Sequence, residues 1–501
     1  MITITPHDST YVKVRCDDFG IEQELVEHFT FNVPGAKFTP KFKSGLWDGK
    51  IRLFNQRTKL VYRGLVDLLF KFSRSRGYEI SIDRDLNPHI DIKLDFVENY
   101  MLGLNLHGRG SPIDIRQYQV DAVHKALSNK RLILESATSS GKSLIIYSII
   151  RYALEKNKKI LLIVPTVGLV NQMVDDFKDY SSANGWDISS NVQSLYAGQS
   201  RVFDKDVVVS TWQTIASMKK SDPDNYEKLA SRTNTMIADE VHTLKAAVVS
   251  STIEGFTSTD HRIGTTGTMD ETMCNALVLI GLVGQVYKII SAADLIKAGQ
   301  AVPVEIKVHL LRHPEHFRKA LKGMDYKEEL SQIISNVARN EYLTDLAIAS
   351  SGNTLLLYRF VENHGKILYE MIKAKAGNRP VYFIHGGVKV EERDRIRNVL
   401  DTDEDAIIVA TESLMSTGIN IPSIENLIFA CPSKSTIRIR QSIGRTLRLK
   451  KGKTKAIIHD IADDYRVGSK KNITFVHMEE RLGIYIKEEF EYTVNQLDLE
   501  Y

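Results

Sequence analysis

The chain has 501 residues, which is too long for a single hydrophobic core, and its length predicts about three or four domains. Its hydrophobic content of 43% and charged content of 26% are close to the averages of globular proteins. The net charge of +4 is mild and does not by itself indicate a nucleic-acid partner.

Residues 1–106 are expected to form a small α+β module. Alternating hydrophobic and β-branched residues predict short strands at residues 11–16, 50–55, 78–82 and 89–96. Residues 20–31 have the spacing of an amphipathic helix. Turn signals such as Pro34-Gly35 and Asp48-Gly49 separate these elements. The sequence of the module contains no recognisable catalytic constellation.

Residues 31–60 concentrate basic and aromatic side chains. Beside one acidic residue, Asp48, the basic residues are Lys37, Lys41, Lys43, Lys50, Arg52, Arg57 and Lys59. The aromatic residues among them are Phe31, Phe38, Phe42, Trp47 and Phe54. Cations for phosphates and aromatic faces for bases predict a nucleic-acid surface with Lys41, Lys43 and Lys50 as contacts. An equally compatible interpretation is a β-domain whose aromatic residues form its core and whose lysines face solvent.

After a linker at residues 107–112, apolar runs alternate with amphipathic helices. The first set of predicted strands covers residues 131–136, 158–166, 206–211, 235–240 and 261–268. The second set covers residues 304–311, 353–358, 379–386, 404–411, 425–432 and 455–461. Strands that alternate with helices imply a parallel sheet with right-handed crossovers in each region. We therefore expect α/β domains at residues 107–300 and 301–501, the second with a C-terminal tail.

The stretch from Ser136 to Ser143 (SATSSGKS) has the layout of a phosphate-binding loop. The full pattern G-x-x-x-x-G-K-[ST] requires glycine where this chain has Ser136. In such a loop Gly141 allows close approach of the backbone to phosphate, Lys142 binds the β- and γ-phosphates, and Ser143 ligates Mg²⁺. The alternative is a turn of small residues before a helix with one exposed lysine.

Two consecutive carboxylates, Asp239 and Glu240, end a predicted buried strand. Open α/β sheets bind ligands at the carboxyl ends of their strands. Asp239 is expected to bind Mg²⁺ through water, and Glu240 to polarise the attacking water. The alternative is a strand that leads into a solvated acidic turn. Farther along the chain, Arg445 and Arg448 have i, i+3 spacing, so a helix would turn both toward one cleft.

Together these motifs resemble the superfamily-two helicases of the DExH type, over about residues 113–460. Asp239-Glu240-Val241-His242 matches the DExH sequence of the family. Its other motifs match residues 115–119, 165–173, 210–215, 264–268, 354–358, 410–422 and 441–448. The resemblance implies two tandem RecA-like parallel-sheet domains with ATP between them, preceded by the small α+β domain.

The resemblance also implies roles for single residues. ATP would be bound by Gln119 at the adenine and by Ala137, Thr138, Ser139, Ser140, Gly141, Lys142 and Ser143 at the phosphates. Arg445 and Arg448 would be arginine fingers, which are worth roughly 10³–10⁵ in rate. Nucleic-acid contact, or coupling of hydrolysis to domain closure, is implied for Thr166, Gln213, His242, Thr266, Thr268, Thr411, Gly418, Asn420 and Gln441.

Several positions depart from the pattern of the family. They are Ser136 and Ser139 in the loop, Gly267 in place of alanine, Met269 in place of proline, and Asn420 in place of aspartate. Serine is small enough for the loop, and asparagine still forms hydrogen bonds. These departures affect fine coupling, and they leave the prediction of an ATPase unchanged.

The resulting functional prediction is an ATP-dependent helicase and branch-migration motor. The resemblance implies action on branched DNA and R-loops in recombination, repair and replication. Expected partners are branched, duplex and single-stranded DNA and RNA–DNA hybrids, with single-strand-binding or recombination proteins as candidate protein partners. We expect a monomer. The alternatives are a duplex translocase that does not separate strands and a nucleic-acid-binding protein that ATP switches.

The sequence also predicts a compartment. Cys16, Cys274 and Cys431 are far apart and have no metal-ligand spacing, and such a sparse, odd count is typical of a reducing environment. No apolar run approaches the roughly 18 residues of a membrane span, and residues 1–5 lack the basic region of a signal peptide. We expect a cytoplasmic protein, located in the host cytoplasm if a phage encodes it, with no membrane partner.

Overall fold

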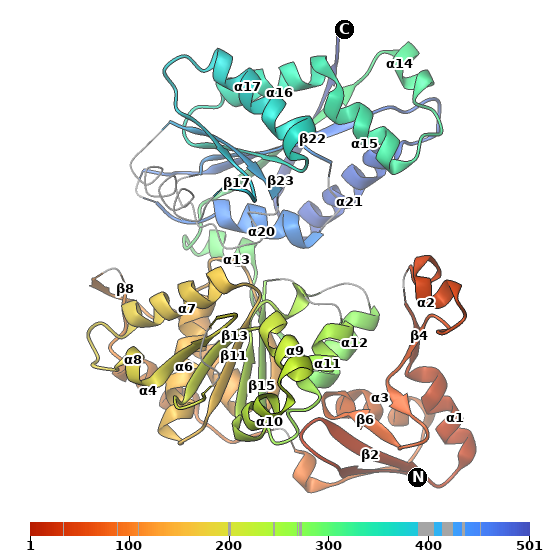
Figure 1. Ribbon diagram of the computed structural model, residues 1–501, viewed down its shortest axis with the longest axis vertical. Helices are drawn as coiled ribbons and strands as arrows, with labels where there is room; N and C mark the ends of the chain where they lie inside the picture. Colours follow the sequence, from red (N-terminus) through yellow and green to blue (C-terminus); the bar gives the residue numbers. More distant parts are fainter. Residues whose placement is uncertain are drawn as a thin grey trace. The chain divides into compact units, whose positions relative to one another are not determined.

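The computed structural model describes residues 1–500 except 34, 88, 109, 199–201, 244–245, 268, 270–272, 389–404, 413–423, 433–435 and 451. The chain divides into two compact units, and the division along the chain falls between Ile290 and Ser291. The first unit contains a small mixed sheet and a seven-stranded parallel sheet, and the second contains another seven-stranded parallel sheet (Figure 1). This architecture confirms the predicted fold class.

The N-terminal module is built on a five-stranded sheet of order β5-β6-β2-β1-β7. Its strands are β1 (Ile2–Pro6), β2 (Tyr11–Cys16), β5 (Phe54–Asn55), β6 (Leu60–Tyr62) and β7 (Ile80–Ile82). The helical elements around it are α1 (Phe19–His28), η2 (Arg63–Leu65), α3 (Val66–Arg76), η3 (Arg84–Leu86) and α4 (Leu94–Gly103). A separate pair, β3 (Thr30–Asn32) and β4 (Lys50–Arg52), carries η1 (Ala36–Phe38) and α2 (Pro40–Lys43) between its strands.

The first seven-stranded sheet has all its strands parallel. In sheet order they are β12 (Val192–Leu195), β13 (Val207–Thr211), β11 (Ile160–Val164), β14 (Thr235–Ala238), β15 (His261–Thr266), β10 (Arg131–Ser136) and β16 (Gln285–Ile290). The longer helices of this domain are α5 (Gln117–Ser128), α6 (Lys142–Glu155), α7 (Val167–Tyr180), α9 (Trp212–Ser221), α10 (Pro223–Arg232), α11 (Ala246–Ile253) and α12 (Met273–Leu282). Its shorter elements are the hairpin β8 (His107–Gly108) and β9 (Ser111–Pro112), α8 (Ile188–Asn191) and η4 (Val241–Thr243).

The second seven-stranded sheet repeats this arrangement. In sheet order its parallel strands are β19 (Val381–Ile384), β20 (Ile407–Thr411), β18 (Thr354–Tyr358), β21 (Asn426–Phe429), β22 (Ala456–Asp464), β17 (Val304–Arg312) and β23 (Glu491–Asp498). Its helical elements are α13 (Ala292–Lys297), α14 (Glu315–Ala320), α15 (Tyr326–Ser335), α16 (Val337–Ala349), η5 (Val361–Gly365), α17 (Lys366–Lys375), α20 (Thr436–Thr446) and α21 (Ile473–Lys487). Among the helices that the structure describes, none has the length and hydropathy that a membrane span requires.

Residue alternation along the strands explains why the first sheet is apolar on both faces. On β11, Leu161 and Ile163 belong to one hydrophobic core, and Ile160, Leu162 and Val164 belong to the core on the other face. Helices cover both faces of a parallel sheet, so its strands are continuous apolar runs. The first of these cores also contains the apolar residues of β1 and β2, so the module and the first sheet share one core.

Two buried arginines join the N-terminal module to the first sheet. Arg131 on β10 donates hydrogen bonds to the carbonyls of Ser9 and Leu282, the latter at 3.0 Å. Arg262 on β15 donates to Thr10 Oγ1 at 2.7 Å. Burying a guanidinium is costly unless its N–H groups form hydrogen bonds. The bonds to Ser9 and Thr10 therefore hold the turn between β1 and β2 against the first sheet.

One element of the module differs from the sequence prediction. The expected strand at residues 89–96 is wrong, because α4 begins at Leu94. Its buried residues Val97 and Met101 are four apart, which is the spacing of one helix face. Both pack in a core of the first seven-stranded sheet. The domain limits at residues 106 and 300 stay predictions.

Candidate nucleotide site

The loop between β10 and α6 holds the residues predicted to bind phosphate. Gly141 has a φ of +82°, and a Cβ at this position would lie 2.5 Å from Nε2 of Gln119, so the position requires glycine. Ser136, which replaces the first glycine of the pattern, is buried, and its Oγ accepts a hydrogen bond from Ser140 Oγ at 3.1 Å. The serine is therefore part of the internal bonding of the loop.

Gln119 contacts this loop directly. Its Nε2 donates to the carbonyl of Ser140 at 3.0 Å, and its Oε1 accepts from the backbone N–H of Arg116 at 3.0 Å. Tyr118 Oη donates to the same Ser140 carbonyl at 2.8 Å. The structure thus shows Gln119 supporting the loop, and its contact with adenine stays a prediction. Sequence reasoning missed Tyr118, although it lies within the matched motif.

The ammonium of Lys142 lies beside the acidic pair at the end of β14. Its Nζ is 3.4 Å from the carbonyl of Ser136 and 3.8 Å from Glu240 Oε1. Burial raises the pKa of Asp239, and the charge of Glu240 raises it further, whereas Lys142 and a hydrogen bond from Thr265 oppose this shift. The fold therefore gathers Lys142, Asp239 and Glu240 at one end of the sheet, as the sequence predicted.

The end of β15 fixes the orientation of both carboxylates. Thr265 Oγ1 donates to Asp239 Oδ1 at 2.6 Å, and the backbone N–H of Gly267 donates to Glu240 Oε2 at 3.3 Å. His242 Nδ1 lies 3.3 Å from Glu240 Oε2 and is hydrogen-bonded to Thr266 Oγ1. Sequence reasoning named His242 and Thr266 but missed Thr265, whose signal was its place beside Thr266 on a strand ending at the site.

The oxygen donors of this edge fit a magnesium ion. Ser143 offers a hydroxyl and Asp239 a carboxylate, which are hard ligands of the kind that Mg²⁺ prefers. The part of the chain that the structure describes contains no cluster of three or more His, Cys, Asp or Glu side chains able to hold a metal. A magnesium ion at a nucleotide site generally takes most of its ligands from phosphate and water. Ser143 Oγ lies 2.7 Å from Tyr180 Oη, another contact that sequence reasoning missed.

The described predicted residues of the second domain lie on one strand of its sheet and on or just after one helix. Thr411 ends β20 and is buried, whereas Gln441 and Arg445 lie on α20 and are half-buried. The helix ends at Thr446, so Arg448 lies two residues beyond its last residue, and the expectation that both arginines face one cleft stays a prediction. Gly418 and Asn420, like Thr268 of the first domain, are outside the described residues.

The remaining predicted residues lie apart from the nucleotide loop in sequence. Thr166 is the N-cap of α7, where its Oγ1 accepts from the backbone N–H of Leu169 at 3.3 Å. Gln213 is exposed near the start of α9. Lys41 and Lys43 on α2 and Lys50 on β4 are also exposed. Their roles in nucleic-acid binding stay predictions.

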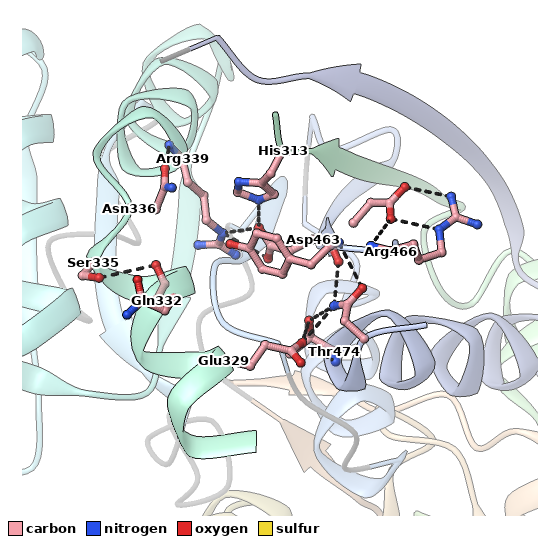
Figure 2. Close-up of polar contacts among 12 residues, drawn as sticks. His313, Glu329, Gln332, Ser335, Asn336, Arg339, Asp463, Arg466 and Thr474 are labelled. Carbon is pink, nitrogen blue, oxygen red and sulfur yellow. Dashed lines mark hydrogen bonds and ion pairs between the residues drawn. The ribbon is translucent and has the colours of Figure 1, made fainter. Parts of the chain in front are cut away.

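A second polar cluster, which sequence reasoning missed, lies at the end of β22 (Figure 2). Asp463 Oδ1 accepts hydrogen bonds from Arg339 Nε at 2.9 Å and from His313 Nε2 at 3.0 Å. Nearby, Glu329 Oε1 accepts from the backbone N–H of Thr474 at 2.8 Å. The partners come from distant parts of the chain, so the only sequence signal was the pair Asp463-Asp464 after an apolar run.

Comparison with known proteins shows which protein families this chain matches. Residues 1–83 match the family model "DNA helicase UvsW, N-terminal", residues 112–271 match "Type III restriction enzyme, res subunit", and residues 338–450 match "Helicase conserved C-terminal domain". The ATP-dependent DNA helicase uvsW of Enterobacteria phage T4 is 32% identical over 98% of this chain and 99% of its own.

Solved structures give the same result. The crystal structure of T4 UvsW covers all of both chains at 29% identity with a TM-score of 0.52. The helicase MrfA bound to DNA covers 79% of this chain and 55% of its own at 16% identity with a TM-score of 0.55, which is a likeness of fold alone.

The paired parallel sheets, the phosphate loop and the DExH carboxylates thus define an ATP-hydrolysing DNA helicase of superfamily two. The prediction from the sequence motifs is confirmed. More narrowly, the chain belongs to the UvsW family of ATP-dependent DNA helicases, along nearly its whole length.

Proposed function

We propose that this helicase uses ATP to remodel branched DNA and R-loops during recombination, repair and replication. The observation that carries the proposal is the site at the end of the first sheet, where Lys142 lies 3.8 Å from Glu240 and Thr265 bonds Asp239. The module of residues 1–83 matches the N-terminal model of the UvsW family. It supports the proposal of branched substrates, because its basic residues offer a phosphate-binding surface in addition to the motor domains.

In the proposed mechanism, phosphoryl transfer to water depends on positioning and charge. Lys142 binds the β- and γ-phosphates of ATP. Glu240, oriented by His242 and Gly267, orients the attacking water. Ser143, and Asp239 through water, would hold Mg²⁺, which would supply positive charge against the phosphates. Arg445 and Arg448 are proposed to act as arginine fingers on the same phosphates.

Hydrolysis is proposed to drive translocation through domain closure. Thr166, Gln213, Thr411 and Gln441 are proposed to contact the nucleic-acid backbone, as are Gly418 and Asn420. Backbone contacts carry no sequence information, so we expect selection of DNA structure rather than of sequence. His242, Thr266 and Thr268 are proposed to couple hydrolysis to closure.

The decisive experiment compares strand displacement on a fork, a four-way junction and an R-loop in parallel, with ATP hydrolysis measured on each substrate. We expect hydrolysis to rise with all three and strands to separate on each, and Glu240→Gln to abolish both. Hydrolysis without strand separation would establish the duplex translocase instead. Absence of any DNA-stimulated hydrolysis would leave the ATP-switched binding protein.

The contribution of the module is tested by replacing Lys41, Lys43 and Lys50 together with alanine. Each lost phosphate contact reduces the slope of log affinity against log salt by about 0.9 for duplex DNA. We expect weaker binding to the junction and a slope smaller by about 2–3, measured by fluorescence anisotropy between low and moderate salt. The matched control is alanine at Lys319, Lys366 and Lys375, exposed lysines of the second unit. Unchanged affinity and slope would mean that the three module lysines are merely solvated.

A further inference from the structure

The pair β3 and β4 forms the base of a finger, defined here as residues 30–33 and 35–52. Figure 1 shows this finger, with α2 near its end, projecting from the sheet of the module. Phe31 and Ile51 at its base pack against the module core. The described residues between 33 and 49 direct their hydrogen bonds to each other, to Lys50 and to Arg52. The end of the finger is therefore a self-contained element.

Local contacts give this element a defined shape. Val33 donates its backbone N–H to the carbonyl of Gly49 at 2.8 Å, and Trp47 Nε1 donates to the carbonyl of Lys50 at 2.9 Å. A Cβ at Gly49 would lie 3.1 Å from the ring of Phe42, so the chain passes close to this ring. Thr39 caps α2, and Pro40 follows it at the first helical position. The finger is thus held as a folded structure.

Two large apolar side chains on the finger are left in solvent. Phe38 is 71% exposed and Leu46 is 82% exposed, on either side of α2. An element that folds this tightly would bury such residues if stability alone were selected. Apolar side chains that unstack base pairs are presented in this manner by proteins that kink DNA, and exposed aromatic rings stack on unpaired bases.

The charge around these residues fits nucleic acid. Lys37 Nζ lies 5.2 Å from the centre of the Phe38 ring, and Lys41 and Lys43 are exposed on the intervening helix. The one acidic residue between 33 and 50, Asp48, is paired with Arg52 Nη2 at 2.5 Å, and this bond lowers the pKa of the carboxyl group. The apolar residues are therefore surrounded by cations for phosphate.

We infer that the finger is the wedge that separates base pairs at the branch point, with Phe38 and Leu46 inserted against the exposed bases. The inference rests on the proposed function, because it needs a branched substrate on which strands separate. It explains how a motor domain shared with duplex translocases is converted into a helicase: the sheets supply movement and the finger parts the strands.

The test is the double variant Phe38→Ala/Leu46→Ala, compared with Phe19→Ala, which removes a phenylalanine that is 70% exposed on α1 of the same module. All three residues are exposed, so folding is preserved. Loss of stacking is expected to slow strand separation on a fork by about 5- to 100-fold. ATP hydrolysis at saturating DNA should stay within about twofold, since the nucleotide site is untouched. Phe19→Ala should behave as the wild type, and Phe38→Trp should retain separation.

A second measurement detects the wedge without ATP. With 2-aminopurine at the branch point, the wild type should raise fluorescence on binding, and the double variant should not. Equal separation rates in the wild type and the double variant would overturn the inference, as would a parallel loss of ATP hydrolysis or an unchanged fluorescence response. If the wild type itself separates no strands on branched DNA, the proposed function has failed and not the wedge alone.

Discussion

The two seven-stranded sheets have the same strand order. In this order β10, β14 and β15 of the first sheet occupy the same places as β17, β21 and β22 of the second. At the ends of the first three, the carboxylates Asp239 and Glu240 share one ammonium, that of Lys142, and the pKa of Asp239 is raised by burial and by Glu240. At the end of β22, burial alone would raise the pKa of Asp463, but Arg339 and His313 lower it.

The difference lies in where the counter-charge comes from. Asp463 and Arg339 are both fully buried, and each is the counter-charge of the other within the unit. The acidic pair of the first sheet keeps an excess of negative charge that a magnesium ion can neutralise. One topology therefore makes a ligand site or a structural brace, depending on whether the chain provides a fixed cation.

The largest expected effect is on the first of these edges. Lys142→Ala removes the cation that stabilises phosphate charge in the transition state, so ATP turnover should fall by about 10²–10³-fold. Steady-state hydrolysis with saturating DNA measures this, and thermal unfolding should show a fold as stable as the wild type. Turnover within a few-fold of the wild type would contradict the assignment of the site.

The brace of the second sheet should respond in stability instead. Arg339→Met leaves Asp463 buried with a weaker set of partners, which should cost about 3–5 kcal/mol of unfolding free energy. Denaturant unfolding measures the loss, and the affinity for nucleotide should not change. Adding Asp463→Asn should recover much of it, because the double variant buries no unpaired charge. A double variant less stable than Arg339→Met would contradict the brace.

The raised pKa of Asp239 gives a pH-dependent prediction for the first edge. The folded protein holds this proton to higher pH than the unfolded chain, so stability falls as pH rises through the raised pKa. Asp239→Asn carries no such charge and should be more stable than the wild type at pH 8 by about 1–3 kcal/mol. The gain should vanish near pH 4, where the unfolded chain also holds the proton. Urea unfolding of the wild type and Asp239→Asn at pH 4 and pH 8 measures the difference in stability. Equal stability of the two proteins at pH 8 would contradict the prediction.

The smallest effect should come from the rim of the second cluster. Arg466 bonds Asp464 through Nη2 at 2.8 Å, but its side chain is 36% exposed. The Asp464 side chain is only 2% exposed, but Arg466 is open to water, so Arg466→Ala should lower the free energy of unfolding by about 1 kcal/mol, well below the loss expected for the fully buried pair. The same unfolding assay measures it, with Arg339→Met as the reference. A loss as large as that of Arg339→Met would show that the Arg466–Asp464 pair contributes as much stability as the fully buried Arg339–Asp463 pair.

Much of the fold could be predicted because its signals are local. The strand of residues 131–136 was predicted with the bounds that the structure shows, since an apolar run between turn residues needs little context. The prediction of a strand at residues 89–96 failed because alternating apolar and polar residues also fit the start of a helix. The helical spacing becomes visible only when Met101 is included. The exposed strand β23 was predicted only as part of a C-terminal tail.

The site divides in the same way. Lys142, Asp239, Glu240 and His242 could be named because each lies in a short contiguous motif. Thr265, Tyr118 and the Arg339–Asp463 pair could not, because their roles depend on partners brought close by folding. The spacing of Arg445 and Arg448 did not show that the helix ends at Thr446, because sequence spacing does not mark helix ends.

The sequence was enough to give the family, the two α/β domains and the nucleotide loop, because the motifs are local and the apolar periodicity follows from the hydrophobic effect. The tertiary structure alone decided which carboxylates remain available for a ligand and which are neutralised, because burial and distant partners set their charge. It also showed which aromatic residues of the segment 31–60 are buried and which are exposed. Some aromatic residues, such as Phe54, are buried in the core, whereas Phe38 is left in solvent among lysines.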